Sequence, residues 1–272
     1  MVDKRRAHKP DYSDIDLARW KEYDDIITDS LWIIGSRASN NGHKLDYHGN
    51  FIPQIPNQVF RRYTRENEIV IDWFLGSGTS AIEAVNLNRR LIGVELKPEL
   101  VEHVERKVFE NVFDGRIRVI RGDSTKKSTV AKVRKALSEM GAERAQFAIL
   151  HPPYADIIRF SDLPDDLSNC ESTSSFLAGF RKAARNAYDL LDPGRFAALV
   201  IGDKYCRGEL DPLGFKCMRV MNEVGFATKS IIVKNIEGNE IAKGKNNNLW
   251  RYRALAGGFY IFKHEYVMVF VK

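Results

Sequence analysis

The sequence predicts an α/β fold: a doubly wound, Rossmann-like sheet of seven strands, mostly parallel, with an antiparallel last strand. Three observations lead to this fold class. Short apolar runs alternate with longer segments of helical periodicity. A glycine turn at 76–78 joins one such run directly to a helix. The last two runs, 229–235 and one within 260–271, follow each other without a helix between them, which indicates a hairpin.

The other elements follow from local signals. Two prolines end the run 145–150, because proline cannot donate to a strand ladder, and an Asp-Pro-Gly turn at 192–194 starts the strand after it. The remaining strands are expected at 68–74, 90–96, 117–124 and 195–203, and helices at 57–63, 81–85, 98–113, 174–191 and 212–224.

Composition sets the broad class. The chain has 272 residues, 44% of them apolar, which is enough for a proper core. No apolar run approaches the ~20 residues of a membrane span, and the charged start is unlike a signal peptide, so we expect a cytoplasmic protein with no membrane partner. Three cysteines without metal-ligand spacing suggest neither a disulfide framework nor a zinc site. A net charge of +6 mildly favours polyanions.

Two regions are expected along the chain. Residues 1–44 are interpreted as an accessory arm, in which the apolar spacing from Tyr12 to Ile26 suggests an amphipathic helix laid on a core. Residues 45–272 form the main domain. Its stiff, proline-containing loop at 48–56 precedes the first long strand.

Acidic residues end three successive strands. Asp72, Glu95 and Asp123 each follow an apolar run. A single such residue is more often a helix cap or a solvated turn. Three in successive β-α units indicate a nucleoside site, because a strand-end carboxylate can accept hydrogen bonds from both ribose hydroxyls. The glycine turn allows close backbone approach, and Thr79 or Ser80 can cap the next helix.

The four residues His-Pro-Pro-Tyr at 151–154 form a second candidate site. Two prolines give a rigid backbone with outward carbonyls, and the flanking residues add one polar side chain and one flat ring. Such a loop at the carboxyl edge of a sheet suits a planar substrate that bears an amino group. The plainer interpretation is a cis-proline turn with a packed tyrosine.

Together these motifs resemble the DNA amino-methyltransferases, which transfer a methyl group from S-adenosylmethionine to N6 of adenine or N4 of cytosine. DWFLGSGTS at 72–80 looks like the family's cofactor motif, D-x-F-x-G-S-G-T-T/S, and HPPY is similar to its catalytic motif, D/N/S-P-P-Y/F/W. The order of the two matches the gamma-type arrangement, and the resemblance covers about residues 45–272. Two residues depart from the pattern: Trp73 replaces the usual proline, and His151 replaces the residue from which the target base is commonly inferred.

The resemblance implies a catalytic methyltransferase domain and assigns its site residues. S-adenosylmethionine would be bound by Pro53, Asp72, Phe74, Gly76, Ser77, Gly78, Thr79, Glu95 and Asp123. The catalytic residues would be His151, Pro152, Pro153 and Tyr154. The Pro152 carbonyl and the His151 side chain would accept the two N–H bonds of the target amine, while Tyr154 stacks on a flipped-out base. With an unperturbed pKa near 6.5, His151 would lose this acceptor role in mild acid.

The implied partner is double-stranded DNA, and a homodimer or a cognate restriction endonuclease of a restriction–modification system is compatible with the family. The best candidate for DNA contact is the loop 234–260, in which basic residues are interleaved with asparagines and a tryptophan. A merely solvated loop is the alternative there. Two other functions stay open: an RNA amino-methyltransferase, and a cofactor-binding DNA-recognition partner with weak or lost catalysis.

Overall fold

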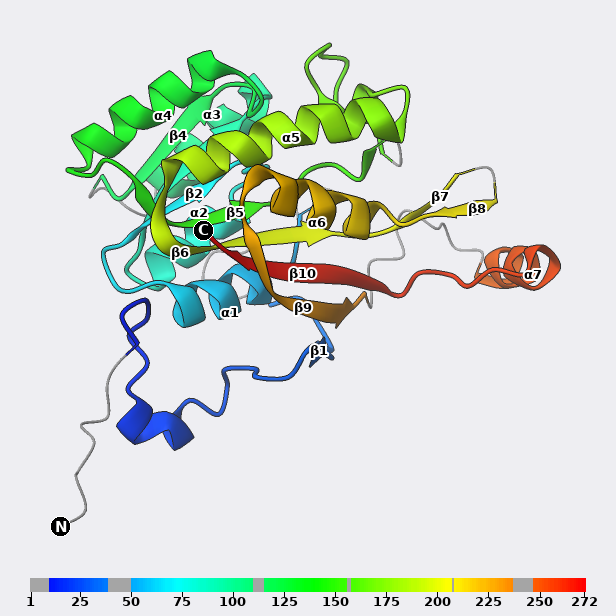
Figure 1. Cartoon of the computed structure of the whole chain (residues 1–272), viewed down its shortest axis with the longest axis horizontal. Coiled ribbons are helices and arrows are strands. Elements are labelled where there is room, and N and C mark those ends of the chain that lie inside the picture. Colours follow the sequence, from blue (N-terminus) through cyan, green and yellow to red (C-terminus); the bar gives the residue numbers. More distant parts are fainter. Residues whose placement is uncertain (1–9, 39–49, 110–114, 156–157, 207, 237–246) are drawn as a thin grey trace.

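The fold is described by a computed structural model at residues 10–38, 50–109, 115–155, 158–206, 208–236 and 247–272. The main sheet has the strand order β1-β9-β10-β6-β5-β2-β3-β4, and β7 and β8 form a separate two-stranded hairpin (Figure 1). The strands are β1 (Leu31–Trp32), β2 (Ile69–Asp72), β3 (Arg90–Glu95), β4 (Ile117–Arg121), β5 (Ala145–Leu150), β6 (Leu191–Ile201), β7 (Lys204–Cys206), β8 (Glu209–Asp211), β9 (Ala227–Asn235) and β10 (His264–Val271). The helices are α1 (Gln54–Tyr63), α2 (Thr79–Asn86), α3 (Pro98–Phe109), α4 (Lys127–Glu139), α5 (Thr173–Leu190), α6 (Leu213–Val224) and α7 (Asn247–Gly257), with two 3-10 turns, η1 (Leu17–Glu22) and η3 (Leu167–Asn169).

The predicted fold class is confirmed. Strands β2 to β6 pair in parallel, and β10 runs antiparallel to both of its neighbours, β6 and β9. The sheet has eight strands rather than the expected seven. The additional strand, β1, is only two residues long and pairs in parallel with β9, so its sequence carries no strand-length pattern.

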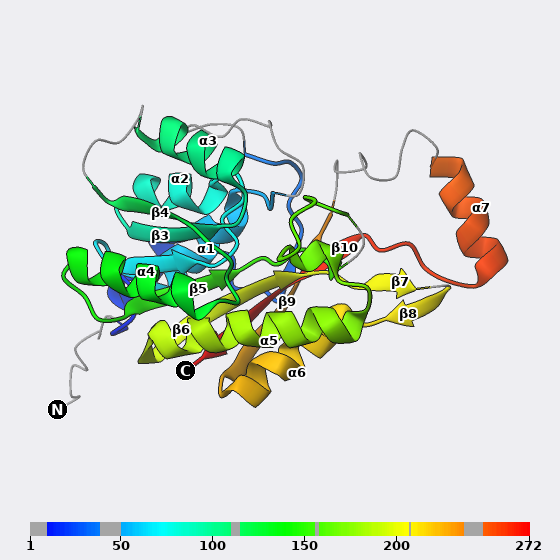
Figure 2. The same cartoon turned by 90° about the horizontal axis from the view of Figure 1, so that it is seen from above.

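Two layers of helices cover the sheet, as Figure 2 shows. Helices α1, α2 and α3 pack on one face and α4, α5 and α6 on the other, each with its own apolar cluster. Alternate residues of one strand enter different clusters: in β5, Phe147 and Ile149 face the first layer, and Ala148 and Leu150 face the second. A strand buried on both faces is apolar throughout, which is why 145–150 is so recognisable in the sequence.

The N-terminal arm differs from the expectation. In place of an amphipathic helix between Tyr12 and Ile26, there is a six-residue 3-10 turn, η1, with no buried residue. The arm is attached by individual side chains instead. The Tyr12 ring meets the Phe196 ring edge-on at 4.9 Å, and Ile26 and Trp32 are buried. The apolar spacing therefore reflects separate anchors along an extended segment.

Strand order places a topological switch point between β2 and β5. The chain proceeds from β2 outward to β3 and β4, and then returns to form β5 on the other side of β2. In open α/β sheets ligands bind at the carboxyl ends of the strands beside such a point. Both sequence motifs begin there, because 72–80 follows β2 and 151–154 follows β5.

Beyond this edge lie α7 and the β7–β8 hairpin, which project from the three-layer body (Figure 1). The Tyr205 ring of β7 lies 4.9 Å from the rings of both Phe259 and Phe262, and its hydroxyl donates to the Tyr260 carbonyl at 2.9 Å. The segment after α7 is thereby packed on the hairpin. Among the described helices, none has the length and apolar content to cross a bilayer.

Candidate active site

The two motifs begin on neighbouring strands. Strands β2 and β5 pair in parallel, and one residue beyond β2 the Trp73 amide still donates to the Ile149 carbonyl at 3.1 Å. The cofactor-type turn and the HPPY loop therefore leave neighbouring strands at the same edge. The next two strands bring Glu95 and Asp123 alongside, since the Gly122 amide donates to the Glu95 carbonyl at 2.9 Å. The three strand-end acids thus come from β2, β3 and the end of β4, as expected.

Asp72 organises the glycine turn from within. Its side chain is fully buried, and one oxygen accepts from the Phe74 amide at 2.9 Å while the other accepts from the Ser80 hydroxyl. Burial raises the pKa of Asp72 to about 6, although both hydrogen bonds favour the ionised form. Its carboxylate therefore holds the two ends of the turn together.

The two glycines of this turn lie in the left-handed region, with φ of +57° at Gly76 and +86° at Gly78. Gly78 is the N-cap of α2, and no side chain caps that helix. A Cβ on Gly78 would lie 3.0 Å from the Val104 side chain of α3, and one on Gly76 would lie 3.3 Å from the Asn50 amide oxygen. The turn requires glycine both for its backbone conformation and for its packing.

Glu95 binds the backbone of this turn. Its carboxylate accepts from the Gly76 amide at 2.9 Å and from the Lys97 amide at 2.8 Å. Burial raises the pKa of Glu95 to about 7, against the effect of these bonds. Asp123 is partly exposed and caps its own turn, accepting from the Thr125 amide and hydroxyl at 2.8 and 2.9 Å. Both acids thus bind turns of the chain itself, as the capping interpretation expects, and their role towards a ligand stays a prediction.

The loop before α1 touches both motifs. Asn50 donates its side-chain amide to the Ser77 hydroxyl, and the Phe51 ring lies 5.0 Å from the His151 ring. Arg37 supports this loop by donating to the Phe51 carbonyl at 3.0 Å. Pro53 itself is buried at the start of α1. The sequence identified the stiff loop but not Asn50 and Phe51, because neither residue type has a distinctive pattern.

The remaining residues of the cofactor-type motif line the interior. Phe74 is partly buried against the α4–α6 side, and Thr79 is buried as the first residue of α2. Trp73, the departure from the family pattern, is fully buried, and its indole Nε1–H has no hydrogen-bond partner among the residues that the structure describes. A buried donor without a partner costs roughly 1–3 kcal/mol, so this replacement is tolerated rather than favourable.

In the HPPY loop all described peptide bonds are trans, so the cis-proline alternative is not seen. His151 is largely enclosed, with the Phe51 ring at 5.0 Å and the Tyr154 ring edge-on at 5.7 Å. Burial lowers the pKa of His151 to about 4; Glu265 opposes this shift and Lys234 adds to it. The expected titration near 6.5 is therefore wrong. His151 is neutral at neutral pH and can accept a hydrogen bond.

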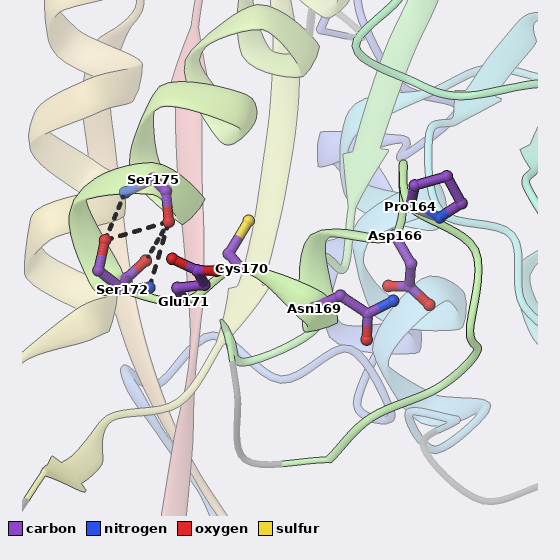
Figure 3. A pocket seen from close by; sticks show the side chains of 7 residues that line it. All are labelled: Pro164, Asp166, Asn169, Cys170, Glu171, Ser172 and Ser175. Atoms are coloured by element: carbon purple, nitrogen blue, oxygen red, sulfur yellow. Dashed lines mark hydrogen bonds between the residues drawn. The ribbon is translucent and has the colours of Figure 1, made fainter.

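The segment after the HPPY loop packs and caps through its own acidic residues. Asp166 is buried and caps η3, accepting from the Ser168 amide at 2.8 Å and from the Ser161 hydroxyl at 2.6 Å. A pocket of about 290 Å³ lies beside it, lined by Pro164, Asp166, Asn169, Cys170, Glu171, Ser172 and Ser175 (Figure 3). Since its buried carboxylate is already engaged, we assign this pocket to the architecture of the loop and not to the reaction.

Comparison with known proteins agrees with this geometry. Residues 2–106 match the family described as DNA methylase. Type II methyltransferase M.BglI of Bacillus subtilis is 27% identical over 108 residues, which are 40% of this chain and 27% of that protein. Type II methyltransferase M.MjaII of Methanocaldococcus jannaschii is 35% identical over 52 residues, 19% of this chain and 10% of that protein. The aligned part of the chain thus spans only about a quarter or less of these relatives.

Among solved structures, TrmN from Thermus thermophilus superposes with a TM-score of 0.51 and 16% identity, covering 83% of this chain and 50% of that one. At this identity the likeness concerns the fold alone. The strand order and this superposition together show a Rossmann-like, doubly wound sheet. The resemblance stated from the sequence is confirmed by the match of residues 2–106 to the DNA methylase family and by the similarity to the two Type II methyltransferases. The HPPY loop lies outside the matched residues.

Asp72→Asn should raise the stability of the protein above about pH 6. Because the folded pKa of Asp72 is about 6 against 3.8 for the free side chain, ionising the buried group costs stability as pH rises through this window. An asparagine keeps both contacts, accepting from Phe74 and donating to Ser80. The expected gain in unfolding free energy is at most about 3 kcal/mol at pH 8, fading towards pH 4. Denaturant titrations at the two pH values measure it; an equal change at both would refute the assignment.

Proposed function

We propose that the protein is a site-specific DNA methyltransferase, which moves a methyl group from S-adenosylmethionine to an exocyclic amino nitrogen, N6 of adenine or N4 of cytosine, of a flipped-out base. One observation carries this proposal: the glycine turn with its strand-end acids and the HPPY loop leave adjacent strands, β2 and β5, at the switch point. The match to the DNA methylase family covers the first of these motifs, and the relatives are Type II methyltransferases by name, which supports the same reaction.

The residues at the edge fit S-adenosylmethionine. The turn at 76–78 has a glycine at each end, and a Cβ on Gly76 or Gly78 would lie within 3.3 Å of a neighbouring side chain. Glu95 would accept from the ribose hydroxyls, and it has the capacity to do so because each carboxylate oxygen keeps a lone pair beyond its bond to a backbone amide. Asp123 lies on the adjacent strand end, where it can accept from the adenine amino group. When bound, this cofactor supplies an electrophilic methyl group on a sulfonium.

The HPPY loop supplies what an exocyclic amine needs. Such an amine is a weak nucleophile, because its lone pair is delocalised into the ring. Two acceptors, the Pro152 carbonyl and the neutral His151 imidazole, would hold one N–H each and turn the lone pair out of the ring plane. Tyr154 would stack on the base. No thiol is used, in keeping with Cys217, which is buried and whose pKa burial raises.

Double-stranded DNA would approach this edge from the side of α7. Helix α7 carries Arg251 and Arg253, both exposed, and the Arg253 guanidinium lies 5.2 Å over the Trp250 ring. Of the three lysines of the predicted loop 234–260, Lys243 and Lys245 fall outside the described residues, and Lys234 is buried in β9, where it pairs with Glu265. An enzyme acting on the cell's own DNA would be cytoplasmic. A homodimer would be seen in the mass of the purified protein in solution, and a cognate endonuclease would cut unmethylated DNA but not DNA that this protein has methylated.

Transfer of labelled methyl groups tests the function. Purified protein is incubated with labelled S-adenosylmethionine and either unmethylated genomic DNA or total RNA, and the modified nucleosides are identified by mass spectrometry. Label in N6-methyladenine or N4-methylcytosine of DNA is the expected result and also names the base. Label in RNA alone would favour an RNA methyltransferase. Binding of DNA and cofactor without transfer would favour a recognition partner.

Glu95→Gln should weaken binding of S-adenosylmethionine by roughly 1.5–3 kcal/mol, because it removes charge-assisted bonds to the ribose. Titration calorimetry measures the affinity. Glu99→Gln is a matched control, since Glu99 is an exposed carboxylate four residues along the chain. An affinity that is equally unchanged in both variants would remove Glu95 from the cofactor site.

His151→Ala should lower the single-turnover rate of methyl transfer by roughly 10²–10⁴ and leave cofactor affinity unchanged. Since the pKa of His151 is about 4, the wild-type rate attributable to this group should be flat between about pH 5.5 and 8. His151→Asn, which restores an acceptor found in the family motif, should recover part of the rate. Near-normal activity of the alanine variant would show that the Pro152 carbonyl suffices.

Arg251→Ala combined with Arg253→Ala should weaken binding to all DNA sequences alike. Each lost phosphate contact reduces the slope of log affinity against log salt by roughly one. Fluorescence anisotropy at several salt concentrations measures this slope. Arg219→Ala, on the exposed side of α6, is the control for general charge. A changed sequence preference would instead show that α7 reads bases.

A further inference from the structure

A buried chain of hydrogen bonds lies behind the tyrosine of the HPPY loop. The Tyr154 hydroxyl donates to Oε2 of Glu265 at 2.8 Å, and Oε1 of Glu265 accepts from Nζ of Lys234 at 2.9 Å. Lys234 also donates to the Asn235 carbonyl at 2.7 Å. Glu265 and Lys234 face each other across strands β10 and β9, and their side chains are only 11% and 5% exposed.

Such a pair needs an explanation other than stability. Removing two charges from water costs about as much as their attraction returns, and an apolar pair of similar volume stabilises a fold at least as well. The pair does something that an apolar pair could not do: it presents a fixed acceptor to the hydroxyl of Tyr154. Burial and Glu265 raise the pKa of Tyr154 well above 10, so that the hydroxyl keeps its proton and donates.

The ring of Tyr154 is constrained on its other sides as well. A Cβ on Gly202, just beyond β6, would lie 2.9 Å from Cε2 of Tyr154, so the ring packs directly on that backbone. His151 meets the ring edge-on at 5.7 Å. With its hydroxyl anchored as well, the ring cannot swing about its side-chain torsions without breaking the bond to Glu265.

We propose that Lys234 and Glu265 are positioning residues for methyl transfer, which hold Tyr154 by its hydroxyl so that its ring is already oriented when the target base arrives. This inference rests on the proposed function. A pre-oriented aromatic ring lowers the ordering cost of stacking, and misplacement of a positioning group by about 1 Å can cost a hundredfold in rate. The pair also stands where β9 ends and β10 begins, at both ends of the connection that carries α7.

Two variants that differ in one acceptor test the inference. Lys234→Met with Glu265→Gln removes both charges but leaves an amide oxygen for the Tyr154 hydroxyl. Lys234→Met with Glu265→Leu removes the charges and the acceptor. The measured quantities are the single-turnover rate at saturating DNA and cofactor, the affinity for S-adenosylmethionine, the melting temperature, and the fluorescence of 2-aminopurine at the target position, which reports the environment of the flipped base.

The leucine variant should lose roughly ten- to hundredfold in rate with cofactor affinity and melting temperature close to those of the wild type, and the glutamine variant should recover most of that rate. In a Tyr154→Phe background the two variants should be equal, because the hydroxyl through which they act is gone. Tyr266→Phe is the control. Tyr266 lies next to Glu265 on β10, and its hydroxyl donates to Asp203 at 2.9 Å, so deleting this hydroxyl should leave the rate unchanged.

The outcomes separate the two claims. If wild-type protein transfers no methyl group to DNA, the proposed function is wrong and this role goes with it. If the wild type is active and the folded leucine variant is as fast as the glutamine variant, the function stands and the positioning role is refuted. The role is equally refuted if the two variants still differ in the Tyr154→Phe background.

Discussion

The site depends on one constraint of topology: β5 must return to the far side of β2. Parallel strands joined by helices place all their carboxyl ends on one edge, but only the return across β2 opens a switch point there. The hydrogen bond from the Trp73 amide to the Ile149 carbonyl extends this pairing one residue beyond β2, up to the first turn of the cofactor-type motif. The separation of the two motifs is thus set by the spacing between neighbouring strands.

Burial then sets the electrostatic character of the edge. It raises the pKa values of Asp72 and Glu95 and lowers that of His151, so all three groups shift towards their neutral forms. A ligand that brings positive charge and hydroxyl donors would reverse part of the shift at the carboxylates, and its binding near neutral pH would release protons. His151 gains no such partner from an uncharged base. The same low polarity would therefore let the acids respond to the proposed cofactor, and it keeps the imidazole neutral.

Much of this arrangement was predictable from the sequence. Prediction succeeded where burial leaves a pattern along the chain and failed where the structure depends on contacts between distant residues. Strand β5 was located to the residue, because it is buried on both faces and stopped by prolines. Strand β1 was missed, since two residues leave no periodicity, and Tyr12 and Ile26 gave a helical spacing although each packs separately. The pKa of His151 could not be anticipated, because it depends on enclosure by Phe51 and on Glu265 and Lys234, which only the fold brings near.

The antiparallel last strand connects these observations. A parallel strand would present only its carboxyl end at the edge where the motifs lie, whereas the hairpin of β9 and β10 presents the end of one strand and the beginning of the other. Because of this antiparallel pairing, Lys234 and Glu265 face each other beneath Tyr154. The connection that carries α7 also begins and ends at this edge. Helix α7, which we propose meets DNA, is therefore carried by the same hairpin whose Glu265 holds the Tyr154 hydroxyl, and a displacement of either strand end would change the position of that hydroxyl's acceptor.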